Sequence, residues 1–287
     1  MTESLLSVRD LGVSANGRPV LRDVSFELAP GEVHGIVGES GAGKSTIVKL
    51  MLGILPRTME MTRGRVEYRG RDLFALAPAA FRALLGAEIA LIPQDPLTAL
   101  NPGRRIDAQL TDGFRLKRKL PRREADARAI ALLEEVHIRE PHRVMRAYPH
   151  ELSGGMRQRV LIAAAFALDP KLVIADEPTT ALDVTVQKQI LRLIRGMQER
   201  HGTAIVFVTH DLGVVAQICD TTSVMYMGKV VEQGPTDRLL TAPAHPYTAA
   251  LIAANPRYDR PEVGLTPIPA RVIERMRAEI AADDSHG

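Results

Sequence analysis

A glycine-rich segment near the N-terminus has the residue types and spacing needed to bind phosphates. It fits the pattern G-x-x-x-x-G-K-S/T and consists of Gly38, Glu39, Ser40, Gly41, Ala42, Gly43, Lys44, Ser45 and Thr46. Glycines let consecutive backbone N–H groups converge on an anion, and a helix that follows adds its positive end. In this pattern Lys44 reaches the β- and γ-phosphates and the Ser45 hydroxyl holds Mg²⁺. A chance match is expected in about 1% of chains of this length.

Two carboxylates, Asp176 and Glu177, follow an apolar run that could place them beside those phosphates. Residues 172–175 read Leu-Val-Ile-Ala, which is typical of a strand buried on both faces of a parallel sheet. Open α/β sheets bind ligands at the carboxyl ends of their strands. Taken alone, such acidic residues are usually only solvated. Together with the glycine-rich segment, they predict that Asp176 serves Mg²⁺ and that Glu177 acts on the attacking water.

A second helix start, at residues 152–156, also has phosphate-binding character. Ser153 is a good N-cap, and Gly154 and Gly155 expose backbone N–H groups at the positive end of the helix. A bare Ser-Gly-Gly is most often just a capped helix. Because the chain already has one phosphate-binding loop, this surplus site makes sense if it serves the nucleotide of another subunit.

The composition limits the possible classes of protein. The chain has 287 residues and 45% hydrophobic content, enough for one large domain or two modest ones. Its single cysteine, Cys219, excludes an internal disulfide and a multi-cysteine metal site. We find no signal-peptide pattern, and the longest apolar run, residues 160–168, is shorter than the ~20 residues of a spanning helix. We therefore expect a soluble chain in a reducing compartment, with any membrane role depending on a partner.

Basic residues concentrate at residues 115–123 in a chain of net charge +3. This run could bind nucleic acid, face anionic lipid headgroups, or be a solvated helix end. Phe114 is its one aromatic neighbour, which gives little basis for base stacking. The pattern favours the solvated helix end, and we expect no nucleic-acid partner.

The periodicity of the chain predicts an α/β core with additions. The apolar runs predict core strands at residues 33–37, 88–93, 172–175 and 204–209. Alternation around the Asn16-Gly17 turn predicts a hairpin over residues 5–28. With strands at residues 64–68, 223–227 and 229–233, that hairpin is expected to form an antiparallel β portion.

The remaining regions are predicted to be helical or irregular. Residues 96–159 are mainly helical in pattern, and residues 124–136 place Ala127, Ile130, Leu133 and Val136 on one face. After Gly234 the chain is Pro-rich and is expected to be irregular, with a frayed, charged tail beyond Ile280.

Four elements resemble motifs of the ATP-binding cassette (ABC) ATPases. Residues 152–159 resemble the signature motif, and residues 181–183, which end in Asp183, resemble the loop that crosses the dimer interface. Gln94 resembles the glutamine that senses Mg²⁺ and water, and His210 resembles the histidine that contacts the γ-phosphate. A lone histidine is more often structural.

The resemblance implies a fold and a set of site residues. The fold is α/β, with a P-loop NTPase (RecA-like) core, an antiparallel β subdomain and an inserted helical subdomain that ends in the signature motif. The implied catalytic residues are Glu177, His210 and Gln94, and the implied Mg²⁺ ligands are Ser45, Gln94 and Asp176. Residues 1–95 and 160–234 would form the core, residues 96–159 the helical subdomain and residues 235–287 a C-terminal extension.

Three stretches narrow the resemblance to the cassette subunits of oligopeptide, dipeptide and nickel importers. They are residues 94–102, 211–216 and 245–248, the last reading His-Pro-Tyr-Thr. Residues 53–56 are similar to one of the two paralogous cassettes that such importers pair. The resemblance implies a peripheral ATPase on the cytoplasmic face of the cell (inner) membrane. Its implied partners are two permeases, a second cassette, for which a paralogue is expected, and, indirectly, an extracytoplasmic substrate-binding protein.

Two departures from the family pattern affect the expectations. The family's adenine-stacking aromatic residue is replaced by Ala15, which predicts weaker nucleotide binding by about 1 kcal/mol or more. Many peptide-type members have a cysteine cluster after the His-Pro-Tyr-Thr stretch; this chain has none, so no iron–sulfur cluster is expected. The shortened tail leans toward the nickel or metal-chelate branch.

Other functions remain open at this stage. A cassette exporter is the closest alternative, and residues 245–248 argue against it. A soluble cassette protein of DNA repair or translation often has a long coiled-coil insertion or a second cassette, and neither pattern is visible here. A small-molecule kinase would leave the signature-like helix unexplained.

Overall fold

The computed structural model describes residues 4–180, 182–254 and 267–286, which belong to two compact units. The first unit contains Met1–Ala75 and Val208–Gly287, and the second contains Leu76–Phe207. Strand β8 (Ala204–Thr209) crosses from the second unit into the first. Among the described residues, none of the helices is both long enough and apolar enough to span a membrane.

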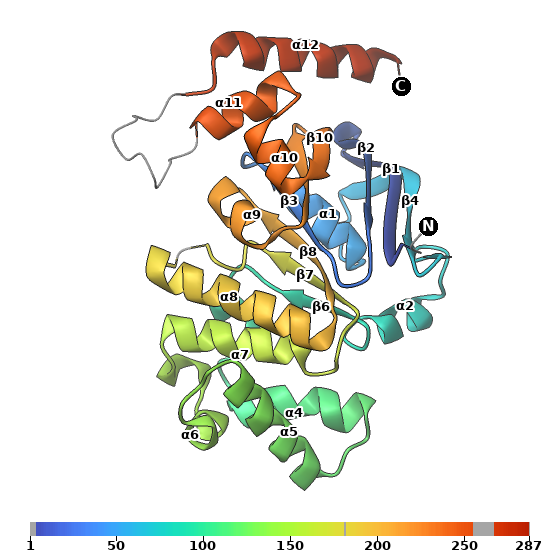
Figure 1. Cartoon of the computed structure of the whole chain (residues 1–287). Coiled ribbons are helices and arrows are strands. Elements are labelled where there is room, and N and C mark those ends of the chain that lie inside the picture. The colour runs from blue at the N-terminus through green and yellow to red at the C-terminus, as the bar shows by residue number, and fades with distance from the viewer. Residues whose placement is uncertain (1–3, 181, 255–266, 287) are drawn as a thin grey trace. The chain divides into compact units, whose positions relative to one another are not determined.

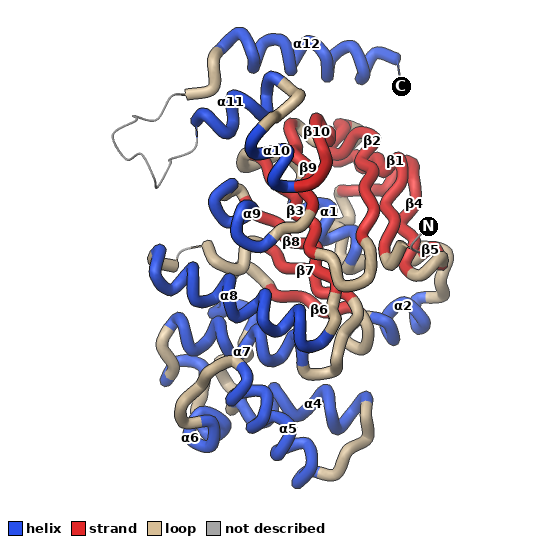
Figure 2. Tube along the Cα trace, viewed as in Figure 1, coloured by secondary structure: helices blue, strands red, loops and turns tan. Residues whose placement is uncertain are grey.

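The first unit contains the predicted N-terminal hairpin. Within the described residues it forms a four-stranded antiparallel sheet of order β2-β1-β4-β5 (Figure 2). These strands are β1 (Leu6–Ala15), β2 (Arg18–Leu28), β4 (Met59–Tyr68) and β5 (Arg71–Asp72). Asn16 and Gly17 connect β1 to β2 with φ values of 50° and 76°, the positive values that a tight hairpin turn requires. The hairpin prediction is confirmed, and β4 begins earlier than predicted.

A second sheet carries the strands that lead to the candidate site. Its order is β10-β9-β3-β8-β7-β6 within the described residues. The strands not yet defined are β3 (Val33–Gly38), β6 (Ile89–Ile92), β7 (Leu172–Asp176), β9 (Thr221–Tyr226) and β10 (Lys229–Pro235). The four predicted core strands are observed, and β3 and β8 are buried along their whole length, as their apolar sequences predict.

The prediction that β9 and β10 belong to the antiparallel β portion is wrong. β9 pairs in parallel with β3, with His34 opposite Thr221 and Gly38 opposite Met225. The two strands therefore extend the second sheet and do not join the antiparallel portion around β1 and β2. Alternation within a strand shows which face is buried, but it does not show which strand lies beside it.

Helices pack on β3 and β9 in the first unit. They are α1 (Lys44–Met51), α9 (Leu212–Ile218), α10 (Thr236–Thr241), α11 (Pro246–Ala254) and α12 (Ala270–His286). A buried apolar cluster joins α9, α10, α11 and α12 to the sheet and contains Val37, Leu212, Val215, Val224, Tyr226, Leu239, Tyr247, Met276 and Ile280. In Figure 1, α11 and α12, drawn in orange and red, lie beside one another. The C-terminal helices are thus part of the core of this unit.

The prediction of irregular chain after Gly234 is wrong for α10, α11 and α12, and so is the prediction of a frayed tail beyond Ile280. Residues 255–266, which that prediction also covered, lie outside the described residues. Helix α12 continues to His286, because Val272, Met276 and Ile280 recur every four residues and form an apolar stripe. Its polar end is also held: Asp284 Oδ1 and Oδ2 accept from Arg22 Nε and Nη2 at 2.7 and 2.9 Å. The hydrogen bond and charge of Arg22 lower the pKa of Asp284.

The second unit is mainly helical around β6 and β7. Its helices are α2 (Pro78–Leu84), α3 (Pro96–Ala99), α4 (Ile106–Lys117), α5 (Arg122–Glu135), α6 (Pro141–Arg146), the 3₁₀ turn Pro149–Glu151, α7 (Gly154–Phe166) and α8 (Val184–His201). The predicted buried face of α5 is partly wrong: Ala127 is exposed, while Ala125 and Ala129 are buried. Helix α5 packs against α4, α6 and α7 at once, so its buried face is wider than a single stripe.

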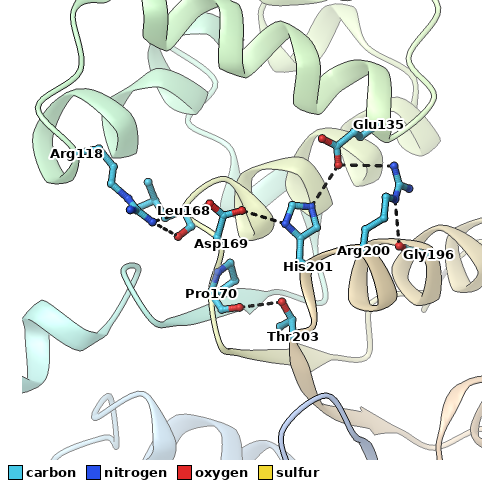
Figure 3. Close-up of polar contacts among 9 residues, drawn as sticks. All are labelled: Arg118, Glu135, Leu168, Asp169, Pro170, Gly196, Arg200, His201 and Thr203. Atoms are coloured by element: carbon cyan, nitrogen blue, oxygen red, sulfur yellow. Dashed lines mark hydrogen bonds and ion pairs between the residues drawn. The ribbon is translucent and has the colours of Figure 1, made fainter.

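Polar contacts fix the C-terminal end of α7 (Figure 3). His201, at the end of α8, contacts Asp169 Oδ1 through Nδ1 at 3.0 Å and Glu135 Oε2 through Nε2 at 3.3 Å. Arg118 Nη2 donates to the carbonyl of Leu168 at 2.7 Å, directly after α7. These contacts join the ends of four helices, so the orientation of α7 is set by its neighbours.

The basic run at residues 115–123 lies at the end of α4 and the start of α5. Lys117 and Arg118 donate to the backbone carbonyls of Leu85 and Leu168. Leu116, between the cations, is 76% exposed. These contacts fit the interpretation of the run as a helix end.

Candidate nucleotide-binding site

The phosphate loop, residues 38–46, connects β3 to α1 in the first unit. Gly41 and Gly43 have φ values of 84° and 99°, which are unfavourable for residues with a side chain. At Gly38 a Cβ atom would lie 2.3 Å from the carbonyl oxygen of Met225 on β9. The glycines at these positions are therefore required by the backbone path of the loop.

Lys44 is held inside this loop. Its side-chain Nζ donates to the carbonyls of Gly38 and Glu39 at 2.6 and 2.9 Å, and the residue is 5% exposed. An ammonium group held among backbone amides, with the exposed Ser45 hydroxyl next to it, provides donors for a polyphosphate and an oxygen ligand for a hard cation. The residues present therefore fit a magnesium-bound nucleotide.

A turn between β9 and β10 supports the loop. Gly228 N donates to the carbonyl of Ala42 at 2.9 Å, and Arg22 N of β2 donates to the carbonyl of Gly228 at 2.8 Å. The hairpin and the phosphate loop therefore contact the same two-residue turn. This arrangement connects β2 of the hairpin to the phosphate loop through the backbone.

Ala15 provides little surface for a base. It pairs with Arg18 of β2 and with Met59 of β4 and is half-buried. Phe26 is the aromatic residue of the two hairpin strands, and it is 2% exposed and stacks on His34 with ring centroids 5.0 Å apart. Phe26 is therefore used in packing and does not replace the expected stacking residue.

The second unit brings Gln94 and Glu177 together. Strands β6 and β7 are parallel neighbours, with Ile92 opposite Ala175, so the residues that follow them meet at one edge. Gln94 Nε2 donates to Glu177 Oε2 at 3.3 Å, and Thr180 Oγ1 donates to the same oxygen at 2.9 Å. These bonds hold the Glu177 carboxylate at the end of the strand. Asp176 is the last residue of β7 and is half-buried.

The signature segment forms an open helix N-terminus. Ser153 is the N-cap of α7, and its Oγ accepts from Met156 N at 3.3 Å. Gly154 is exposed, and a Cβ built on it would meet nothing within 4 Å. A Cβ built on Gly155 would lie 3.7 Å from Val186 Cγ1 on α8. The exposed amides leave room for an anion from outside the unit.

Two other predicted site residues have local capping or turn environments. Asp183 is the N-cap of α8, and its Oδ1 accepts from Thr185 N and Val186 N at 3.0 and 2.9 Å. Ala181 of the same predicted loop lies outside the described residues. His210 is exposed and follows β8 in the first unit, directly before Asp211, the N-cap of α9.

The sequence analysis did not predict that Tyr247 contacts the phosphate loop. Tyr247, the second residue of α11, donates from its hydroxyl to Glu39 Oε2 in the phosphate loop at 3.2 Å. The signal was the His-Pro-Tyr-Thr stretch, which we used to classify the chain but did not connect to the loop.

The chain belongs to the ABC transporter ATPases. The ABC transporter family model matches residues 21–180, which is more than half of the chain. A second model, for the oligopeptide/dipeptide transporter C-terminal region, matches residues 231–280. Together with the phosphate loop and the signature helix, these matches make the protein an ATP-hydrolysing cassette subunit.

Two relatives show which ABC transporter subunits the chain is similar to. The chain is 46% identical to the probable D,D-dipeptide transport ATP-binding protein DdpD of Escherichia coli strain K12, over 95% of this chain and 84% of that one. It is 45% identical to the oligopeptide transport ATP-binding protein OppD of Bacillus subtilis strain 168, over 92% and 76%.

Two solved structures have the same fold. The structure of cbiO1 from Clostridium perfringens, part of the ABC transporter complex cbiONQ, aligns with TM-score 0.73 and 28% identity over 90% of this chain and 97% of that one. A dimeric post-hydrolysis structure of the ATP-binding cassette MJ0796, bound to ADP and Pi, aligns with TM-score 0.70 and 25% identity over 80% and 98%. The fold prediction is confirmed.

Proposed function

We propose that this chain powers an importer for peptides as one of its two ATPase subunits. The observation that carries the proposal is the match of residues 231–280 to the oligopeptide/dipeptide transporter C-terminal region. Tyr247, Met276 and Ile280 of that segment lie in the core of the first unit, so the segment is integral to the cassette. The names of DdpD and OppD support peptides as the cargo class over nickel or metal chelates. The C-terminal segment also favours an importer over an exporter or a soluble cassette protein.

Each predicted residue has a proposed role in ATP hydrolysis. The amides of the phosphate loop and Lys44 hold the phosphates, and Ser45, Gln94 and Asp176 hold Mg²⁺. Mg²⁺ held by these residues would supply positive charge that neutralises the phosphates. Glu177 orients and deprotonates the attacking water, and His210 contacts the γ-phosphate.

Glu177 is already constrained for this role. The two hydrogen bonds from Gln94 and Thr180 hold its Oε2 atom at the end of the strand. Because Gln94 has contacts with Glu177 and a proposed role at Mg²⁺, it would adjust the carboxylate when the metal is bound.

We propose that the signature helix serves a partner cassette. The exposed amides of Gly154 and Gly155 at the start of α7, with Ser153, would contact the γ-phosphate held by the partner's loop. Two ATP molecules would then lie between two cassettes, which close on binding and reopen after hydrolysis. Asp183 would lie at that interface. The dimeric form of MJ0796 supports such a pairing.

We propose that two permeases bind the second unit near α3 and the helical subdomain. Leu97 on α3 is 61% exposed, an apolar side chain next to Gln94 in sequence. A permease segment that covers Leu97 would therefore be close to the residue that contacts Glu177. With this docking, the chain would lie peripherally on the cytoplasmic face of the membrane, and an extracytoplasmic binding protein would act through the permeases.

The test is reconstitution of the chain with its permeases, its partner cassette and its binding protein in liposomes. Peptide-loaded binding protein should stimulate ATP hydrolysis and peptide uptake, and Lys44→Ala should remove both. If Ni²⁺ or a metal chelate stimulates uptake and peptides do not, the cargo proposal is wrong while the ATPase proposal survives. If no cargo stimulates hydrolysis, the importer proposal itself is wrong.

A further inference from the structure

The C-terminal region reaches the phosphate loop through one side-chain contact. Tyr247 Oη donates to Glu39 Oε2 at 3.2 Å, across 208 positions in sequence. Glu39 is the second residue of the phosphate loop, and its side chain is exposed. The contact therefore connects α11 to the part of the loop that surrounds the proposed phosphate site.

Tyr247 is a rigid donor. It is fully buried, and its ring lies 4.7 Å from the ring of Tyr226 at an angle of 53°. The same apolar cluster contains Val37, the residue before Gly38 of the loop. Burial and the charge of Glu39 raise the pKa of Tyr247 above its ordinary value. The hydroxyl therefore stays protonated and can donate at every pH at which the protein works.

The backbone around Tyr247 is fixed as well. Glu232 accepts from the amides of Ala244 and His245 at 2.8 and 3.0 Å. His245 Nδ1 in turn accepts from Tyr247 N at 3.1 Å. Burial opposes ionisation of Glu232, but its hydrogen bonds outweigh that effect and lower its pKa. The His-Pro-Tyr segment is thus held by an ionised carboxylate, and the tyrosine ring has one position.

Glu39 is a negative charge inside an anion-binding loop. Its own carbonyl accepts from Lys44 Nζ at 2.9 Å, so its backbone belongs to the lysine's environment. A carboxylate free to rotate at this position would approach a bound triphosphate and repel it. The bond to Tyr247 keeps the carboxylate on the α11 side of the loop.

We propose that Tyr247 is a positioning residue for nucleotide binding, which acts by holding the Glu39 carboxylate in place. This inference rests on the proposed role of residues 38–46 in binding phosphates. It makes nucleotide affinity depend on the docked state of the C-terminal region, because undocking α11 releases the Glu39 charge. A partner that displaces α11 would thereby weaken ATP binding without contacting the loop.

A double-mutant cycle tests the proposal through the Kd of the isolated chain for MgATP. Tyr247→Phe removes the hydroxyl and keeps the ring, and it should raise Kd by about three- to tenfold, a size expected for one poorly screened charge. Glu39→Gln should bind at least as well as the native chain. The double variant should match Glu39→Gln, because no charge remains to be misplaced.

Salt and a shortened side chain give independent readouts. The effect of Tyr247→Phe should shrink as ionic strength rises, since it acts through charge. Glu39→Asp, whose carboxylate is one methylene too short to reach Tyr247, should reproduce the loss without altering the aromatic core. It therefore tests the proposal even if Tyr247→Phe folds poorly. Tyr226→Phe, which removes the hydroxyl of the neighbouring ring, is the matched control and should leave Kd unchanged.

The outcomes separate the possibilities. An unchanged Kd in Tyr247→Phe, or an equal loss in the native and Glu39→Gln backgrounds, would overturn the positioning role. A native Kd in Glu39→Asp would do the same. If Lys44→Ala also binds MgATP with native affinity, then it is the assignment of the phosphate loop that has failed.

Discussion

Gln94 donates a hydrogen bond from Nε2 to Glu177 Oε2 over 3.3 Å. The two residues are 83 positions apart in the chain, and they meet because β6 and β7 are parallel neighbours whose ends coincide. The glutamine that we propose to bind Mg²⁺ and the carboxylate that we propose to activate water are therefore directly hydrogen-bonded. This contact gives the first prediction a definite structural basis.

Glu177→Gln should bind MgATP as well as the native protein but hydrolyse it about 10²–10⁴ times more slowly. The amide keeps the size of the side chain but cannot take a proton from water. Binding should survive because Lys44 and the loop amides are unchanged. Cassette dimers with trapped ATP should accumulate in size-exclusion chromatography with MgATP, with the native partner cassette added if the pair is heteromeric. Near-native turnover would show that another residue is the base.

Lys44→Ala should weaken nucleotide binding and hydrolysis together. In the proposed role, the lost ammonium would contact phosphate in the ground state and in the transition state, so both steps should be affected. The variant also leaves the carbonyls of Gly38 and Glu39 without their present donor. Calorimetry for binding and phosphate release for turnover are the measurements. Native values for both would contradict the phosphate-loop assignment.

Ser153→Arg should leave MgATP binding by the isolated chain intact but abolish turnover in the assembled transporter. Ser153 caps α7 in the second unit, and the long cation would cover the exposed helix N-terminus that we propose faces the partner's nucleotide. A loss of nucleotide binding by the isolated chain is the result that this division of roles does not allow. Circular dichroism would show whether α7 still forms after removal of the cap.

Ala15→Tyr should tighten MgATP binding by about 1 kcal/mol if this position lies at the adenine. Ala15 is half-buried at the end of β1, so its side chain is partly accessible to a ligand. GTP measured in parallel would show whether purine selectivity changes too. An unchanged or larger dissociation constant would mean that Ala15 is elsewhere or that another group already stacks on the base.

Acid should destabilise the fold through His34 on β3. Burial lowers the pKa of His34 from 6.5 to about 4, so between these values the unfolded chain binds a proton that the folded chain does not. The free energy of unfolding should then fall by up to about 1.4 kcal/mol per pH unit as pH decreases through this window. The stability is complete above pH 6.5, the unfolded pKa.

Urea unfolding of the native chain and of His34→Gln, at steps from pH 7 to pH 4.5, measures this contribution. The variant should be less stable at pH 7, since Thr221 and Ser223 lose their contacts with the imidazole, but its stability should decline less steeply with acid. Equal slopes in the two proteins would exclude His34 as the titrating group.

Local patterns were enough to predict the parts of the site that are continuous in sequence. The phosphate loop and the strand before Asp176 are each determined by residues next to one another, so backbone geometry and apolar runs identify them. The resemblance to a family implied that Gln94 and Glu177 are both catalytic, but their hydrogen bond to each other was not predicted.

Contacts between distant segments could not be predicted in the same way. The position of β9 beside β3 and the bond from Tyr247 to Glu39 depend on tertiary packing, which single-strand or single-helix patterns do not encode. Helix α12 was different, because Met276 and Ile280 gave a helical stripe that the charged residues around them obscured. The four-residue spacing of these apolar residues was visible in the sequence, but the charged composition of the segment led us to predict a frayed tail.

The turn at Gly228 determines where the chain can accept added sequence. A Cβ at Gly228 would lie 2.1 Å from the carbonyl of Val20, and the turn bonds to both Ala42 and Arg22. At Gly70, between β4 and β5, a Cβ would meet nothing within 4 Å. A fluorescent label, affinity tag or split point for in-cell assays therefore belongs at the Gly70 turn, whereas the same insertion at Gly228 would disturb the phosphate loop that such an assay is meant to observe.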